Sequence, residues 1–165
     1  MPSLRVSKEL KDEIYFVTFT VKDWIYIFNK SGCFEILEKS FVYCQKQKGL
    51  KIYAFVFMLN HLHFIGSAQD LGDVIRDLKK YTSKEFKKYI QKYEPHLFKL
   101  FIKKGKYQFW QKTNCPKIIE TDYFFNQKMD YIHNNPVKKG YVENPEDWRW
   151  SSCSNIPTQI SVEEE

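Results

Sequence analysis

Two histidines placed one residue apart are the part of the sequence best suited to chemistry. His61 and His63 flank Leu62 directly after an apolar run. In a β-strand, residues i and i+2 project to the same face, so this spacing would place two imidazoles side by side. Two neutral imidazoles can hold a divalent metal if a third ligand comes from elsewhere in the chain. The spacing alone is a weak signal, because such a pair can equally be structural or merely exposed.

The segments around the histidines predict a strand–turn–strand unit. Residues 51–58 (KIYAFVFM) are almost continuously apolar, and residues 61–67 (HLHFIGS) follow after Leu59 and Asn60. This pattern is typical of two strands joined by a tight turn. The histidines would then open the second strand, next to the turn.

Helices are predicted on both sides of this unit. Apolar residues recur at three- and four-residue spacing from Phe34 to Cys44, and Gly49 suits the end of that helix. Asp70 is a suitable N-cap for a longer amphipathic helix that Pro95 should end.

The remaining predicted strands and one further helix complete the order of elements along the chain. Further strands are predicted at residues 13–20, 107–110 and 115–120. A last helix should begin at Thr121 or Asp122, and Pro136 should stop it near Asn135. The order predicts an α+β fold, a ferredoxin-like sandwich. Its antiparallel sheet would have helices packed on one face, with the last helix near the C-terminus.

Length and composition indicate one domain over residues 1–165, with a core at about 13–153 and an acidic tail (SVEEE) that should fray. No leader-like or membrane-length apolar run is found, so we expect a soluble, cytoplasmic protein without a membrane partner. The four cysteines lack C-x-x-C spacing and are expected to be free thiols, mostly in the core.

The net charge of +6 is unevenly distributed along the chain. Residues 70–120 carry thirteen basic and six acidic side chains, together with many aromatic ones. Phosphates attract cations and unpaired bases stack on rings, so this segment fits a nucleic-acid groove. The alternative is a solvated lysine face. The predicted contacts lie on the outer side of the second helix: Lys80, Lys84, Lys87 and Lys88.

Three runs of sequence resemble a known family. AFVFMLNHLHFIGS is similar to the strand–turn–strand signature of the HUH single-tyrosine transposases. DYIHNNPVKKGYVENPEDWRWSS resembles the C-terminal signature of their REP-associated tyrosine transposase group, and YQFWQK resembles an aromatic stretch of that group. The resemblance covers residues 13 to 153, and separate motifs in the right order are more specific than one. Leu59 departs from the family pattern, which usually has proline there.

The resemblance implies an activity and a role for particular residues. His61 and His63 would hold Mg²⁺ or Mn²⁺, and Tyr131 would be the nucleophile. Asn135 lies four residues after Tyr131, so a helix would place both on one face, where the carbonyl oxygen of Asn135 could be a third ligand. Gln127, one turn earlier, shares that face. The implied enzyme is a DNA transposase, a single-strand endonuclease and strand transferase. It would nick and rejoin a single-stranded DNA hairpin through a covalent phosphotyrosine.

Other functions remain open from the sequence. Within the same class, the chain could be a transposase that excises its own insertion sequence. A metal-free single-stranded nucleic-acid-binding protein on a ferredoxin-like fold is the main alternative, although no RRM signature is present and it would leave the histidine pair unexplained. A zinc hydrolase is disfavoured because H-E-x-x-H is missing. The sequence leaves monomer and homodimer, and an active site in cis or in trans, equally open.

Overall fold

A four-stranded antiparallel sheet forms the centre of the computed structural model, which describes residues 12–113 and 116–164. The strand order is β2-β3-β1-β6. The strands are β1 (Tyr15–Thr20), β2 (Lys51–Phe57), β3 (His61–Ser67) and β6 (Lys117–Ile118). Each hydrogen-bonded pair is antiparallel. With helices after β1 and β3, the chain order is β-α-β-β-α-β, which confirms the predicted ferredoxin-like plan.

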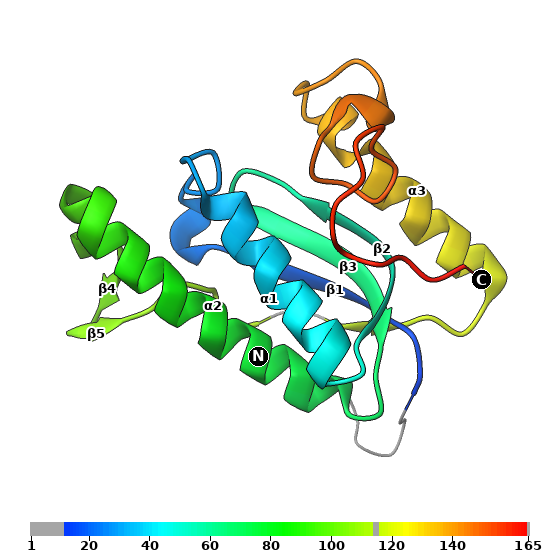
Figure 1. Ribbon diagram of the computed structural model, residues 1–165, viewed down its shortest axis with the longest axis horizontal. Helices are drawn as coiled ribbons and strands as arrows, with labels where there is room; N and C mark the ends of the chain where they lie inside the picture. The colour runs from blue at the N-terminus through cyan, green and yellow to red at the C-terminus, as the bar shows by residue number, and fades with distance from the viewer. Residues whose placement is uncertain (1–11, 114–115, 165) are drawn as a thin grey trace.

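Two helices, α1 (Cys33–Gln47) and α2 (Leu71–Tyr93), cover one face of the sheet (Figure 1). Side chains alternate between the faces of a strand, and Leu62 and Phe64 of β3 pack into the core under these helices. That core is dense in aromatic rings, including Phe41 of α1 and Phe86 of α2. The apolar positions of the helices therefore face the sheet, as predicted.

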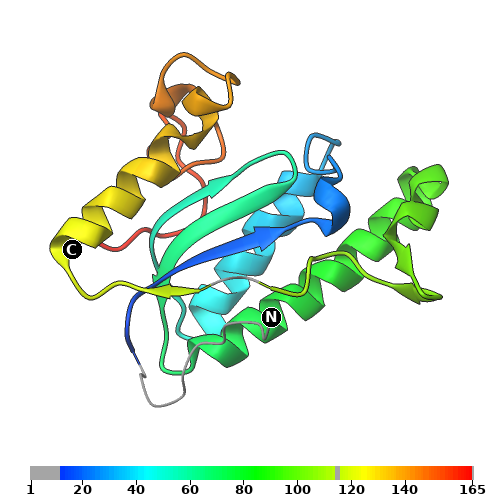
Figure 2. The same cartoon turned by 180° about the vertical axis from the view of Figure 1, so that it is seen from behind.

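The third helix, α3 (Asp122–Lys138), lies apart from α1 and α2 (Figure 2). Its buried residues Phe125 and Ile132 join a second apolar cluster with Val56 and Ile65 of the sheet. Ile65 is on the same face of β3 as His61 and His63. The sheet therefore separates α1 and α2 from the face that carries the histidines, and α3 packs on the histidine face.

The end of α3 differs from the prediction that Pro136 stops the helix near Asn135. The helix continues to Lys138 with Pro136 inside its last turn. Gly140, with φ 79°, then donates to the carbonyl of Val137, and the Tyr141 amide donates to the carbonyl of Pro136. This pair of bonds is a Schellman cap, which satisfies carbonyls left over at a helix end.

Short elements complete the chain. A 3-10 turn, η1 (Lys22–Trp24), follows β1, and η3 (Pro145–Asp147) follows α3. After α2, which ends before Pro95 as predicted, come η2 (Pro95–Phe101) and a small ribbon of β4 (Ile102–Lys103) and β5 (Lys106–Tyr107). The strand predicted at 107–110 is thus limited to β5, which reaches only Tyr107. Of the strand predicted at 115–120, whose first residue lies outside the described residues, β6 is the part observed as a strand.

The C-terminal segment, whose acidic end is predicted to fray, contacts the rest of the domain in its described part. The Glu163 amide donates to the Ile52 carbonyl at the edge of β2, and Ile160 is buried. Gln45 of α1 exchanges two hydrogen bonds with the backbone of Ser161.

The remaining expectations from the sequence concern free cysteines and membrane-spanning helices. Cys33 and Cys44 are buried free thiols and Cys153 is a partly buried one, whereas Cys115 lies outside the described residues. Within the described ranges, no helix is long and apolar enough to cross a membrane.

Candidate active site

The β2–β3 turn places both histidines at one end of the sheet. The Met58 amide donates to the His61 carbonyl at 2.8 Å, which closes the turn. Residues 27 and 28 donate to the carbonyl of Leu59, so the turn is held from outside although Leu59 is not proline. The two imidazole rings lie edge to face with centroids 4.9 Å apart.

Asn60 fixes the tautomer of His61. Its side-chain Nδ2 donates to the Trp24 carbonyl at 3.1 Å, and a carbonyl can only accept. Oδ1 of Asn60 must therefore be the atom that lies 2.8 Å from His61 Nδ1. An oxygen without hydrogen can only accept, so Nδ1 carries the proton. The lone pair of a neutral His61 is then on Nε2, the nitrogen left free for a ligand.

His63 is held in a similar way from the neighbouring strand. Thr18 lies directly opposite it in the β1–β3 pairing, and Thr18 Oγ1 is 2.7 Å from His63 Nδ1. In the described part of the chain, His63 Nε2 is buried without a hydrogen-bond partner. A buried nitrogen without a partner is costly. A metal ion bound through Nε2 would satisfy it, so the residues fit such an ion.

Burial keeps both histidines neutral. It lowers the pKa of His61 to about 4, with a smaller effect from the charge of Lys139. It also lowers the pKa of His63 to about 3, with smaller effects from His61 and Lys128. Neutral imidazole is the form that binds a metal ion.

Tyr131 lies beside this pair. Its ring centroid is 5.3 Å from that of His63 in an edge-to-face arrangement, and Phe16 packs against both rings. Tyr131 is 40% exposed, so a large substrate can reach it. Nζ of Lys128, one turn earlier on α3, lies 5.2 Å from the ring centroid of Tyr131. The structure thus brings together a phenol, a cation and two neutral imidazoles.

Asn135 lies on the same side of α3, one turn after Tyr131, and is buried. Asn135 is four residues after Tyr131 on α3, so the two share a helix face, and it is Tyr131 that contacts the ring of His63. Among residues 12–113 and 116–164, no three His, Cys, Asp or Glu side chains form a metal-binding group. Asn135 therefore remains the proposed third ligand.

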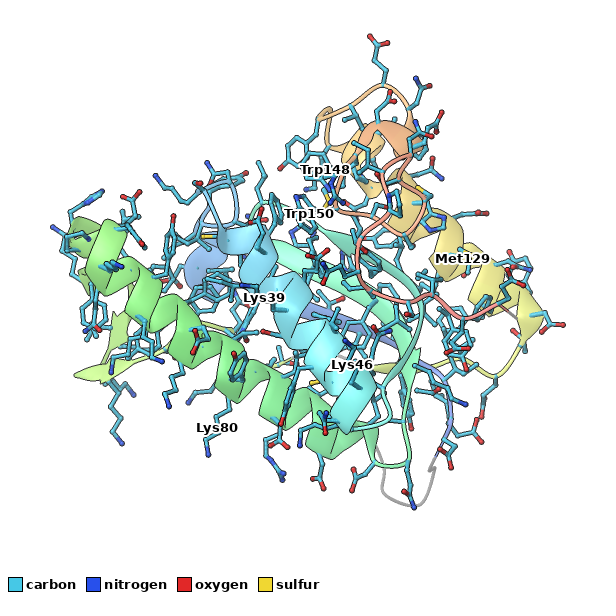
Figure 3. The ribbon with its side chains drawn as sticks, viewed as in Figure 1. Lys39, Lys46, Lys80, Met129, Trp148 and Trp150 are labelled. Carbon is cyan, nitrogen blue, oxygen red and sulfur yellow. The ribbon has the colours of Figure 1, made fainter. Side chains whose placement is uncertain are left out.

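The four predicted DNA-binding lysines do not lie in this site, because α2 is on the opposite face of the sheet (Figure 1). Lys80 points outward from α2 (Figure 3). Together with Lys84 it lines a groove of about 620 Å³ between α1 and α2, beside the exposed Tyr43 and Tyr81. The other two are engaged within the protein: Lys87 lies over the Tyr107 ring and Lys88 pairs with Glu85.

Three residues of the site were missed by sequence reasoning. Thr18 could have been found from the strand register, since it faces His63 across β1 and β3. Lys128 is three residues before Tyr131, a spacing that places neighbours on a helix face. Asn60 was assigned only to the turn, because its contact with Trp24 joins segments 36 residues apart.

Known proteins resemble this chain in sequence and fold. A family model described as "Transposase IS200 like" matches residues 10–135. A protein of Haemophilus influenzae named as a REP-associated tyrosine transposase is 28% identical over 99 residues. That match covers 60% of this chain and 56% of the relative, so the chain spans little more than half of the relative's length.

A solved structure of a REP-associated tyrosine transposase bound to a REP hairpin matches with a TM-score of 0.72. The match covers 92% of this chain and 82% of that one at 20% identity. At this identity the likeness concerns the fold.

Proposed function

The chain belongs to the IS200-like transposase family, and on that basis we propose that it nicks and rejoins single-stranded DNA through a covalent bond to Tyr131. The observation that carries the proposal is the position of Tyr131, with its ring 5.3 Å from that of His63 and 40% of its surface exposed. A tyrosine in an ordinary structural role would have no need of two neutral histidines beside it.

The metal-binding residues in this proposal are His61, His63 and Asn135, and the ion is Mg²⁺ or Mn²⁺. The unpartnered Nε2 of His63 and the tautomer of His61, which leaves its lone pair on Nε2, support the two histidine ligands. The helix face that Asn135 shares with Tyr131 supports the third ligand. When bound, such an ion offsets the negative charge of a phosphodiester and orients in-line attack. Phe16, Thr18 and Asn60 keep the rings in place, so that little rearrangement is needed when DNA binds.

The chemical step transfers a phosphoryl group to Tyr131. The tyrosine oxygen forms a bond to phosphorus, and the bond from phosphorus to the 3′-oxygen of the preceding nucleotide breaks. The phenol loses its proton and the 3′-oxygen gains one, so charge and atoms balance. The phosphotyrosine keeps the energy of the ester, and a 3′-hydroxyl of another strand can reverse the step. Nζ of Lys128, 5.2 Å from the ring centroid of Tyr131, offers positive charge near the nucleophile.

The proposed substrate is a single-stranded DNA hairpin, such as a REP-like element. The support is the likeness in fold to a protein whose structure holds a REP hairpin, together with the basic segment 70–120. Lys80, Lys84, Lys87 and Lys88 would grip DNA away from the scissile phosphate, since the sheet lies between them and Tyr131. Stacked Tyr43 and Tyr81 beside Lys80 and Lys84 favour such a contact.

The proposal is tested with hairpin DNA labelled at the 5′ or the 3′ end. We expect label downstream of the nick to become attached to the protein in Mg²⁺ or Mn²⁺, and no attachment in EDTA. Tyr131→Phe should abolish both the nick and the adduct while hairpin affinity and fold stay nearly unchanged, because only a hydroxyl is removed. Tyr123→Phe and Tyr81→Phe are matched controls and should retain activity.

The same assay distinguishes the alternative. Hairpin binding without any adduct or nick in wild-type protein would support a non-catalytic DNA-binding protein. An adduct that persists in Tyr131→Phe would assign the nucleophile to another residue.

A further inference from the structure

The backbone at η1 adopts a conformation that its residues disfavour. Asp23 and Trp24, two consecutive residues other than glycine, have φ values of 54° and 57°. The left-handed region is tolerable for aspartate but strained for a bulky residue such as tryptophan. Strain of this kind persists only where the surroundings impose it, and it concentrates at functional sites.

Contacts from several parts of the chain impose this conformation. Nζ of Lys22 donates to the carbonyl of Leu100 at 2.8 Å and also pairs with Asp23. The Trp24 amide donates to the carbonyl of Val21. The Trp24 carbonyl accepts the Nδ2 hydrogen bond from Asn60, the same residue that orients His61. The strained turn and the histidine pair are therefore parts of one hydrogen-bonded unit.

The result of this strain is an exposed indole at the candidate active site. Trp24 is 55% exposed, although it is among the largest apolar side chains. Its ring lies edge to face with that of His61 at 5.8 Å. Trp110, by contrast, is 5% exposed and donates its indole hydrogen to Thr82 in the core. The fold therefore bears a strain that keeps one tryptophan in water next to His61.

We propose that Trp24 stacks on an unpaired base next to the scissile phosphate, and so sets the position of the single strand over the histidines. This inference rests on the function proposed above and assigns it a nucleotide-binding subsite. An indole face stacks on any base, whereas a lone ring is too small a surface for a protein partner. Lys139, whose charge reaches His61, supplies attraction for the neighbouring phosphate.

The experiment is a scan with abasic sites across the nick. Hairpins with one base removed at a time on either side of the cleaved bond are bound to Tyr131→Phe protein, so that affinity is measured without cleavage. We expect one position beside the nick to lose about tenfold in affinity when its base is absent. In the double variant Tyr131→Phe, Trp24→Ala, removing the base at that position should no longer lower the affinity for the hairpin. Base removal at the other positions should have the same effect as in Tyr131→Phe alone. Trp24→Phe should retain most of the effect, because a ring remains.

Tyr93→Ala is the matched control, since Tyr93 is 59% exposed at the end of α2. It should leave the abasic profile unchanged. The subsite is refuted if Trp24→Ala leaves the profile unchanged or lowers affinity equally at every position. The proposed function fails separately, through the lack of a nick and adduct in wild-type protein, because the binding scan does not depend on cleavage.

Discussion

The side-chain amide of Asn60 determines which nitrogen of His61 is available. Removing it in Asn60→Ala frees His61 to turn and to change tautomer, and also releases the backbone of Trp24. We expect the affinity for Mn²⁺ to fall by roughly 10- to 100-fold, the usual effect of losing a residue that orients a ligand. Titration calorimetry measures this directly. Asn134→Ala is the control, because Asn134 bonds only within α3 and should leave Mn²⁺ affinity unchanged.

The low pKa values of His61 and His63 make stability depend on pH. Both pKa values are lowered in the folded protein, to about 4 and about 3, from about 6.5 in the unfolded chain. The unfolded chain therefore binds more protons as pH falls through 6.5, which favours unfolding. In metal-free protein, the contribution of the two histidines to the free energy of unfolding should be complete above pH 6.5 and decrease as the pH falls from 6.5 to about 3.

Urea unfolding in EDTA at several pH values measures this decrease. Other groups also titrate, so the comparison is with His63→Leu, whose curve should be flatter over the same range. Identical slopes in the two proteins would mean that His63 is not held neutral by burial.

At the residue scale, the sequence predicts contacts between residues that are close in the chain and misses contacts between residues that are far apart in it. The i, i+2 histidines share one face of β3 because strand geometry requires it. The resemblance singled out Tyr131, which spacing alone could not choose among eleven tyrosines. The residues next to Trp24 do not predict its strained backbone. One of the contacts that hold this turn is the hydrogen bond from Lys22 to the Leu100 carbonyl, and these two residues are 78 positions apart in the sequence.

At the scale of elements, the lysines on the outer side of α2 can be tested as a DNA-binding surface. If Lys80, Lys84, Lys87 and Lys88 contact phosphates of a single strand, each neutralised lysine should lower the salt dependence of binding by about 0.7 in log–log slope. The contacts seen within the protein refine this expectation. Lys88 pairs with Glu85 and Lys87 lies over Tyr107, so Lys80→Gln and Lys84→Gln should account for most of the change.

Fluorescence anisotropy from low to moderate salt measures the slope. Lys46→Gln on α1 is a control of equal charge outside the groove between α1 and α2. If the salt dependence of binding is unchanged in the quadruple Lys→Gln variant, the four lysines form a solvated surface and do not contact DNA.

The elements also show why rules for helix ends succeed or fail. Asp70 accepts a hydrogen bond from the Asp73 amide, as an N-cap residue should, because a cap is decided within one turn. Pro136 was expected to stop α3, yet the Schellman cap at Gly140 lets the helix run one turn further. A proline rule that ignores the residues after it therefore places the end too early.

At the scale of the whole molecule, the C-terminal segment is part of the domain. Deleting residues 158–165 would expose the core around Ile160 and leave the Ile52 carbonyl of β2 unpaired. Burial of one isoleucine contributes about 1.5–3 kcal/mol, so the melting temperature should drop by roughly 5 °C. Differential scanning calorimetry gives this value. Deleting only residues 164 and 165 should have little effect, and an equal melting temperature after the longer deletion would show that the segment is dispensable.

The position of the sheet between the histidines and α2 has an evolutionary consequence. A substitution on the outer surface of α2 reaches neither the core side chains Leu62 and Phe64 of β3 nor the ring contacts of Tyr131 on the other face of the sheet. If α2 holds DNA as proposed, descendants of such a protein can accumulate changes on α2 that alter which DNA they hold, while the proposed chemistry on the opposite face is inherited intact. Target preference can then drift quickly within a lineage in which the nucleophile and its histidines stay fixed.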